Sequence, residues 1–81
     1  MTQWTVLGRP ECSLCEQLLA ELAHELSPAE AARVEVLDVD QDPALARKYG
    51  HRIPVLLADD EFVCDYRLDP ERVRLITGTR S

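Results

Sequence analysis

Several features that define large protein classes are missing from this sequence. No apolar run approaches the roughly 20 residues that a membrane-spanning helix needs, and the stretch from Met1 to Trp4 lacks the basic start and apolar run of a secretion signal. Basic residues number 9 against 15 acidic ones, and the net charge is −6. Because nucleic acids and anionic membranes bind basic surfaces, we expect neither as a partner. These absences indicate a cytoplasmic protein.

The chain is too short for more than one domain. Its 81 residues, 46% hydrophobic and 30% charged, have the composition of a globular protein. Surface scaling indicates that a chain of this size buries roughly 60–65% of its surface on folding. That is enough for one core and leaves no room for a separate substrate domain. We therefore expect a single monomeric domain spanning residues 1–81.

Cysteine is scarce, with three residues in the chain. An odd number of cysteines without an export signal does not fit a static disulfide framework. Two of them are spaced as Cys12-Ser13-Leu14-Cys15. This spacing suits either a pair of reactive thiols or half of a metal site.

The apolar pattern predicts alternating strands and helices. Strands are expected at residues 2–7, 34–39, 53–57 and 61–66. Helices are expected at residues 12–26, from Asp42 to Gly50 and from Asp69 to Gly78, with a short helical turn beginning at Ser27. Gly50 is expected to end its helix in the left-handed conformation.

The order of these elements, β-α-β-α-β-β-α, indicates an α/β fold. Strands joined through a helix are expected to run parallel. The last two strands, joined by a tight turn at Asp59-Asp60, are expected to be antiparallel. The sequence therefore predicts a four-stranded mixed sheet with helices on both faces.

The position of Cys12 at a helix start favours reactivity. As the capping residue, its sulfur would face the free N–H groups of Leu14 and Cys15, and these donors together with the helix dipole favour a thiolate. Arg9 would support that charge, whereas nearby glutamates oppose it. Cys15 lies one turn later on the apolar face. It is therefore expected to resolve a mixed disulfide formed by Cys12.

Two other interpretations of the cysteines are open. A structural zinc site needs four ligands, and the remaining candidates, Cys64, His24 and His51, have no zinc-finger spacing. Alternatively, the pair is simply buried. We predict no metal site, and we expect Cys64, within an apolar strand, to contribute to packing.

The order of elements, the Cys12/Cys15 pair at the first helix and Ile53-Pro54 before the third strand together resemble the thioredoxin superfamily. The short chain is most similar to small bacterial glutaredoxin-like proteins. This resemblance implies a thioredoxin-like, glutaredoxin-type fold in which Pro54 is cis and faces the cysteine pair. It also implies that the main chain of Ile53 holds the substrate.

The same resemblance implies contacts with glutathione. Arg9 stands where glutaredoxins carry a basic residue that pairs with a glutathione carboxylate. Asp65 stands near the position of an acidic residue that holds the glutathione amine. The chain also departs from the pattern, because Ser13-Leu14 replaces Pro-Tyr between the cysteines and Phe62-Val63-Cys64 stands where a Gly-Gly pair is usual.

The expected partners follow from this mixture of features. The segment Tyr66-Arg67-Leu68-Asp69 is similar to the Phe-Arg-Pro-Asp segment of glutaredoxin-shaped proteins reduced by thioredoxin reductase. The resemblance therefore implies a disulfide-containing protein or glutathione as substrate. The reductant would be a thioredoxin-type or glutathione reductase.

The predicted function is thiol–disulfide oxidoreduction in cell redox homeostasis and electron transport. Cys12 and Cys15 would reduce mixed disulfides of proteins or of glutathione. No permanently bound cofactor is expected, and glutathione would serve as co-substrate. The alternative is a non-catalytic binding module, which would act as an adaptor or as a glutathione-dependent carrier of an iron–sulfur centre or metal.

Overall fold

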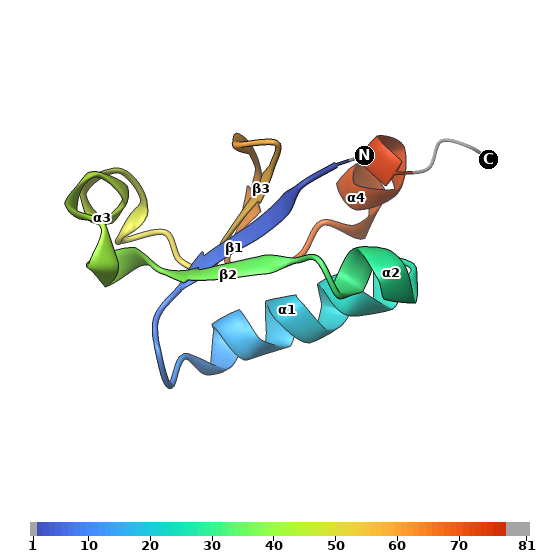
Figure 1. Cartoon of the computed structure of the whole chain (residues 1–81). Coiled ribbons are helices and arrows are strands. Elements are labelled where there is room, and N and C mark those ends of the chain that lie inside the picture. Colours follow the sequence, from blue (N-terminus) through green and yellow to red (C-terminus); the bar gives the residue numbers. More distant parts are fainter. Residues whose placement is uncertain (1, 78–81) are drawn as a thin grey trace.

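The computed structural model describes residues 2–77 and shows a four-stranded sheet with helices packed around it (Figure 1). The strands are β1 (Trp4–Gly8), β2 (Glu35–Asp38), β3 (Val55–Ala58) and β4 (Glu61–Asp65). The helices are α1 (Ser13–Glu25), α2 (Pro28–Ala31), α3 (Pro43–Tyr49) and α4 (Pro70–Thr77), with a 3-10 turn, η1 (Val39–Gln41), after β2. The predicted order of elements is confirmed. The expected helix end at Gly78 lies outside the described residues.

The four strands lie in the order β2-β1-β3-β4. β1 and β2 are parallel, whereas β3 runs antiparallel to both β1 and β4. The expectation that helix-joined strands run parallel is therefore right for β1 and β2 but wrong for β2 and β3.

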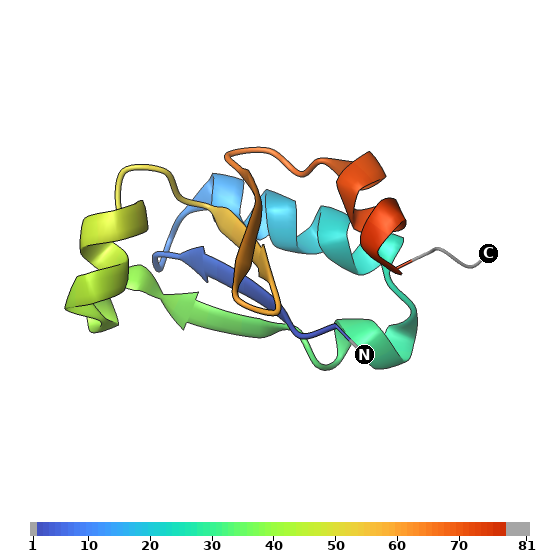
Figure 2. The same ribbon diagram turned by 90° about the horizontal axis from the view of Figure 1, so that it is seen from above.

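The short helix α3 explains this reversal. It has 7 residues, about 10 Å of helix, and it lies beyond the end of the sheet where β1 and β2 finish (Figures 1 and 2). It does not carry the chain back along the sheet. The chain re-enters the sheet from that same end, and Val55 at the start of β3 pairs with Leu7 near the end of β1.

Local capping fixes the helix ends. Ser27 and Glu30 form the predicted capping box at α2, and the Asp42 side chain accepts two main-chain N–H groups in the first turn of α3. Gly50 ends α3 in the right-handed conformation, at φ −56°, so the left-handed expectation is wrong. Its N–H continues the helical pattern by donating to the Ala46 carbonyl at 2.9 Å. None of the described helices is long and apolar enough to cross a membrane.

Helices α1 and α4 cover one face of the sheet, whereas α3 and η1 pack against the other face only at the end where β1 and β2 finish (Figure 1). The prediction of helices on both faces is therefore confirmed in part. On one face, α1 and α4 contribute to a buried cluster that includes Trp4, Val6, Leu18, Leu22, Leu56 and Val73. On the other face, α3 and η1 contribute to a cluster of Leu7, Val39, Tyr49, Val55 and Leu57. Successive residues of β1 enter opposite clusters, because side chains along a strand alternate between its faces. This packing holds the start of α1 against the end of β1.

Candidate active site

The Cys12–Cys15 pair lies where the chain passes from β1 into α1. The loop turns sharply at Glu11, with φ 61°. Cys12 then takes the extended conformation of an N-cap residue, with φ −102° and ψ 109°. The two sulfurs form a disulfide, and their Cα atoms are 5.2 Å apart. The prediction that Cys12 caps the first helix is confirmed.

The sulfur of Cys12 accepts a hydrogen bond from the helix main chain. The Cys15 N–H donates to it at 3.2 Å. The sequence also predicts the Leu14 N–H as a donor to this sulfur. That prediction is wrong, because within the described residues the Cys12 side chain accepts from the Cys15 N–H alone. Cys12 is half-buried, whereas Cys15 is only 9% exposed. The more accessible sulfur therefore sits at the helix start, with the second sulfur behind it.

Gly8, the last residue of β1, leaves the space that the Cys15 side chain occupies. A Cβ atom at Gly8 would lie 2.8 Å from the Cys15 sulfur and 3.1 Å from its Cβ. Closely packed interiors do not admit such short contacts, so a larger residue would force Cys15 to move. From the sequence, Gly8 marks only the end of a strand. The contact arises from the way α1 packs on β1, which no sequence signal reveals.

The predicted proline loop lies at the start of β3. The Ile53–Pro54 peptide bond is cis, as the resemblance implies. Pro54 is buried, and its carbonyl accepts the N–H of Tyr66 at 2.8 Å. The Tyr66 hydroxyl donates to the His51 carbonyl at 2.8 Å. Two hydrogen bonds from the segment after β4 therefore hold the loop.

Asp65, predicted to hold the glutathione amine, is paired with Arg52. The Arg52 Nε donates to the Asp65 carboxylate at 2.9 Å. The guanidinium also lies over the Phe62 ring, 4.6 Å from its centroid, in a cation–π contact. A ligand ammonium group would have to compete with Arg52 for this carboxylate.

Arg9, predicted to hold a glutathione carboxylate, is paired as well. Its Nε and Nη2 donate to the Asp40 carboxylate at 2.8 and 3.1 Å, and its Nη1 donates to the Gly50 carbonyl at 3.0 Å. The hydrogen bonds between the two side chains are the main cause that raises the pKa of Arg9 and lowers the pKa of Asp40. The guanidinium ties the loop before Cys12 to η1 and to the end of α3. A ligand carboxylate would have to displace Asp40.

Cys64 is a buried free thiol on β4, opposite Leu56. Burial is the main cause that raises its pKa, so the thiol stays protonated at neutral pH. It packs in the cluster beneath α1 and α4, which confirms the expectation that it contributes to packing. Among residues 2–77, no group of three or more His, Cys, Asp or Glu side chains is placed to hold a metal ion.

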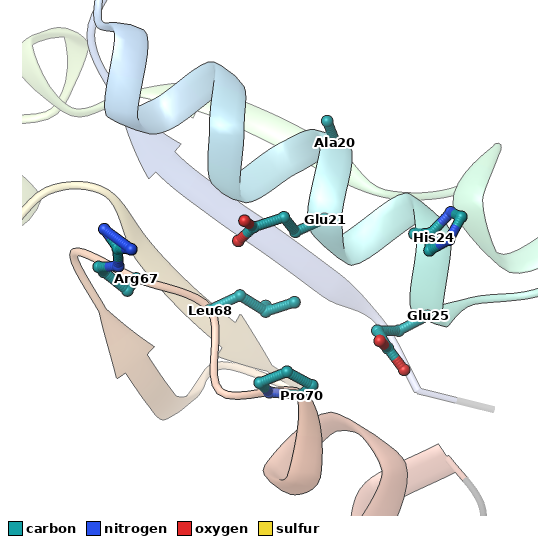
Figure 3. Close-up of a pocket in the computed structure, with 7 residues that line it drawn as sticks. All are labelled: Ala20, Glu21, His24, Glu25, Arg67, Leu68 and Pro70. Atoms are coloured by element: carbon teal, nitrogen blue, oxygen red, sulfur yellow. The ribbon is translucent and has the colours of Figure 1, made fainter.

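A separate pocket of about 460 Å³ lies along the later turns of α1 (Figure 3). It is lined by Ala20, Glu21, His24, Glu25, Arg67, Leu68 and Pro70. Glu21 and Leu68 extend from opposite walls (Figure 3), and Arg74 holds the Glu25 carboxylate through hydrogen bonds of 2.9 and 3.2 Å. Its lining includes none of the predicted site residues, so the candidate active site does not extend to it.

The sheet topology, the capped helix start and the cysteine pair define a protein of the thioredoxin superfamily. A family model described as Glutaredoxin-like domain (DUF836) matches residues 3–75. The chain belongs to this glutaredoxin-like family. A search of the curated proteins finds no significant match.

Two solved structures share this fold over nearly their whole length. The solution NMR structure of protein Ne2328 from Nitrosomonas europaea is 34% identical, with a TM-score of 0.79 over 93% of this chain and 89% of that chain. The X-ray structure of target protein XcR50 from X. campestris is 28% identical, with a TM-score of 0.60 over 90% of this chain and 92% of that chain. The thioredoxin-like fold expected from the sequence is thus confirmed.

The Asp40 carboxyl should titrate below its ordinary pKa of 3.8. Because Arg9 favours the charged form, the pair stabilises the fold above that pH, and the stabilisation is lost as the pH falls through the lowered pKa of the folded protein. An NMR titration of the Asp40 side chain measures this pKa. Arg9→Gln should return it to the ordinary value, whereas Arg74→Gln, which removes the pair with Glu25, should not. An ordinary pKa in the parent protein would show that the pair does not form in solution.

Gly8→Ala should destabilise the oxidised protein by about 1–3 kcal/mol, the usual range for overpacking. The same substitution should destabilise the reduced protein less, because the Cys15 side chain is then free to rotate away from the new methyl group. Urea unfolding of both redox forms measures the difference.

Gly50→Ala is the matched control for this experiment. A Cβ at Gly50 would meet the Ala46 carbonyl and the Arg9 guanidinium and not the cysteines, so Gly50→Ala should destabilise both redox forms by the same amount. If Gly8→Ala also destabilises both redox forms equally, the contact with the Cys15 sulfur is not the reason that position 8 requires glycine.

Proposed function

We propose that this protein is a dithiol–disulfide oxidoreductase that reduces disulfide bonds in other proteins. The observation that carries the proposal is the placement of the pair. Cys12, half-buried at the N-cap of α1, accepts the Cys15 N–H and is bonded to the more buried Cys15. A nucleophilic thiol requires access and a stabilised thiolate, and a resolving thiol must lie within bonding distance of it. The start of α1 supports both roles, with Cys12 as the nucleophile and Cys15 as the resolving thiol.

The reaction proceeds in two exchanges. In the reduced protein, the Cys12 thiolate attacks one sulfur of the substrate disulfide, forms a mixed disulfide and releases the other substrate sulfur as a thiolate. The Cys15 thiol loses its proton to solvent and attacks Cys12, which releases the second substrate sulfur. The substrate gains two electrons and the Cys12–Cys15 disulfide forms. A reductase then returns two electrons to the pair.

The main chain of α1 is the principal support for negative charge on Cys12. The Cys15 N–H already donates to the sulfur, and the N-terminus of a 13-residue helix adds its dipole. Arg9, expected to support the thiolate, has its charge balanced by Asp40. Glu11 and Glu16 are exposed on either side of Cys12 and oppose the charge. The thiolate therefore depends on backbone groups and not on a neighbouring cation.

Three observations favour a protein disulfide over glutathione as substrate. The Arg9 guanidinium is bound to Asp40 and Gly50, and the Asp65 carboxylate is bound to Arg52. At the position of the usual Gly-Gly pair, the Phe62 ring is 41% exposed and lies against the Arg52 guanidinium, which hinders close approach of a small ligand to the backbone. A protein substrate does not need these two charged contacts. It can be held through the main chain of Ile53 beside Pro54, as the resemblance implies.

The reductase, the cellular compartment and the oligomeric state stay predictions. A thioredoxin-type reductase suits a site whose glutathione-binding groups are engaged, and a glutathione reductase system is the second candidate. Catalysis in the cytoplasm by a monomer fits a cycle in which the pair must be re-reduced. No resident cofactor takes part in the proposed steps.

Cys12→Ser should reduce insulin or a peptide disulfide no faster than the uncatalysed background, because serine provides no thiolate. Cys15→Ser should retain the first step and accumulate the mixed disulfide, which intact-protein mass spectrometry detects. Cys64→Ser should keep the parent rate, since the buried thiol lies outside the exchange. If Cys12→Ser is as fast as the parent, the protein is not an oxidoreductase, and the fold serves as a binding module.

Glutathione should cause no saturable chemical-shift changes at Arg9, Ile53 or Asp65 in an NMR titration of the reduced and oxidised protein. A disulfide peptide should shift the Ile53 amide. Asp40→Asn provides the matched control, because it releases Arg9 and should allow weak binding of the glutathione carboxylate. Saturable shifts at all three residues in the parent protein would show that glutathione is the ligand.

A further inference from the structure

A groove of about 320 Å³ lies between α1 and β2, beside Cys15. Cys15 forms part of its lining, as do Pro10 and Glu11, the two residues immediately before Cys12. Among the strands of residues 2–77, β2 pairs only with β1 and forms one edge of the sheet, and the groove continues between α1 and this edge. A polypeptide whose disulfide reaches Cys12 would thus have this groove directly beside it.

Two of the three carboxylates that line the groove, Glu11 and Glu16, form no ion pair within residues 2–77. Glu11 and Glu16 are exposed and Asp38 is half-buried. Asp38 accepts the Asp40 N–H at 2.9 Å, and it lies near enough to Arg9 for the two charges to attract. Arg9 also lines the groove, but Asp40 balances its charge. The groove therefore presents uncompensated negative charge next to the reacting sulfurs.

The groove also contains apolar surface. The Val36 side chain of β2 is 56% exposed, and Leu19 of α1 is half-buried on the opposite wall. Val36 pairs with Val6 across the sheet and therefore points toward α1. Exposed apolar side chains rimmed by charges of one sign mark a surface that fits a segment of the opposite charge with apolar residues.

We propose that this groove docks the segment of the substrate protein that flanks its disulfide, and that this segment is basic and partly apolar. The inference rests on the proposed oxidoreductase function and names its substrate class. An extended chain advances about 3.3–3.6 Å per residue, and the Cα atoms of Cys12 and Cys15 are 5.2 Å apart. Glu11 and Glu16 are the chain neighbours of Cys12 and Cys15, so lysine or arginine residues a few positions from the substrate cysteine come within reach of both carboxylates.

The test compares three synthetic peptides that carry the same disulfide flanked by lysine, by neutral residues or by glutamate. In low salt, the parent protein should reduce the lysine peptide with a kcat/KM roughly fivefold above that of the glutamate peptide, and the preference should shrink as salt screens the charges. The readout is the ratio of kcat/KM for the lysine peptide to kcat/KM for the glutamate peptide. A ratio is needed because removing carboxylates near Cys12 also changes the intrinsic reactivity of Cys12 toward every disulfide.

Matched variants assign the preference to the groove. The double variant Glu11→Gln with Glu16→Gln should bring the ratio close to one, whereas Glu21→Gln, a carboxylate on α1 outside the groove, should leave it unchanged. Val36→Ser should raise KM for all three peptides but not for hydroxyethyl disulfide, which is too small to occupy the groove.

The outcomes separate this inference from the function on which it rests. If the protein reduces hydroxyethyl disulfide and all peptides without regard to charge, the docking proposal is wrong and the oxidoreductase function stands. The docking proposal is equally wrong if Glu21→Gln lowers the ratio as much as the double variant does. If no disulfide is reduced, both proposals fail together.

Discussion

The hydrogen bond from the Cys15 N–H to the Cys12 sulfur joins the fold to the chemistry of this protein. A helix start must satisfy unpaired main-chain donors, and here a cysteine does so in place of the usual serine or aspartate. The bond requires α1 to begin at the end of β1, and Gly8 makes room there for the second sulfur. The buried cluster beneath α1 in turn fixes the helix on the sheet. The geometry of two sulfur atoms thus depends on the packing of the whole domain.

Much of this architecture could be predicted because it is encoded by local rules. Cys12, Ser27 and Asp42 cap helices in the structure as their positions in the sequence indicate. The hairpin turn at Asp59-Asp60 was also predictable, and both residues have the positive φ that a two-residue type I′ turn requires. Patterns of this kind concern residues within a few positions of one another, so they need no knowledge of the tertiary structure.

What could not be predicted depends on contacts between distant segments. The reversal of β3 follows from where α3 lies, which the helix's own sequence does not specify. The pairing of Arg9 with Asp40 joins residues 31 positions apart, and the contact of Gly8 with Cys15 depends on how one element packs on another. For the same reason, the resemblance to glutaredoxins located Arg9 and Asp65 as charged residues near the site but could not show that both already have partners.

The use of a cysteine as helix cap has a consequence for how such a domain can diverge. Serine differs from cysteine by a single atom and is among the best N-cap residues. A lineage could therefore exchange sulfur for oxygen at position 12 and keep α1, the sheet and the groove beside it. Under the proposed function, loss of disulfide exchange would then leave the helix cap in place, and an oxidoreductase of this shape could evolve into a binding protein by one substitution.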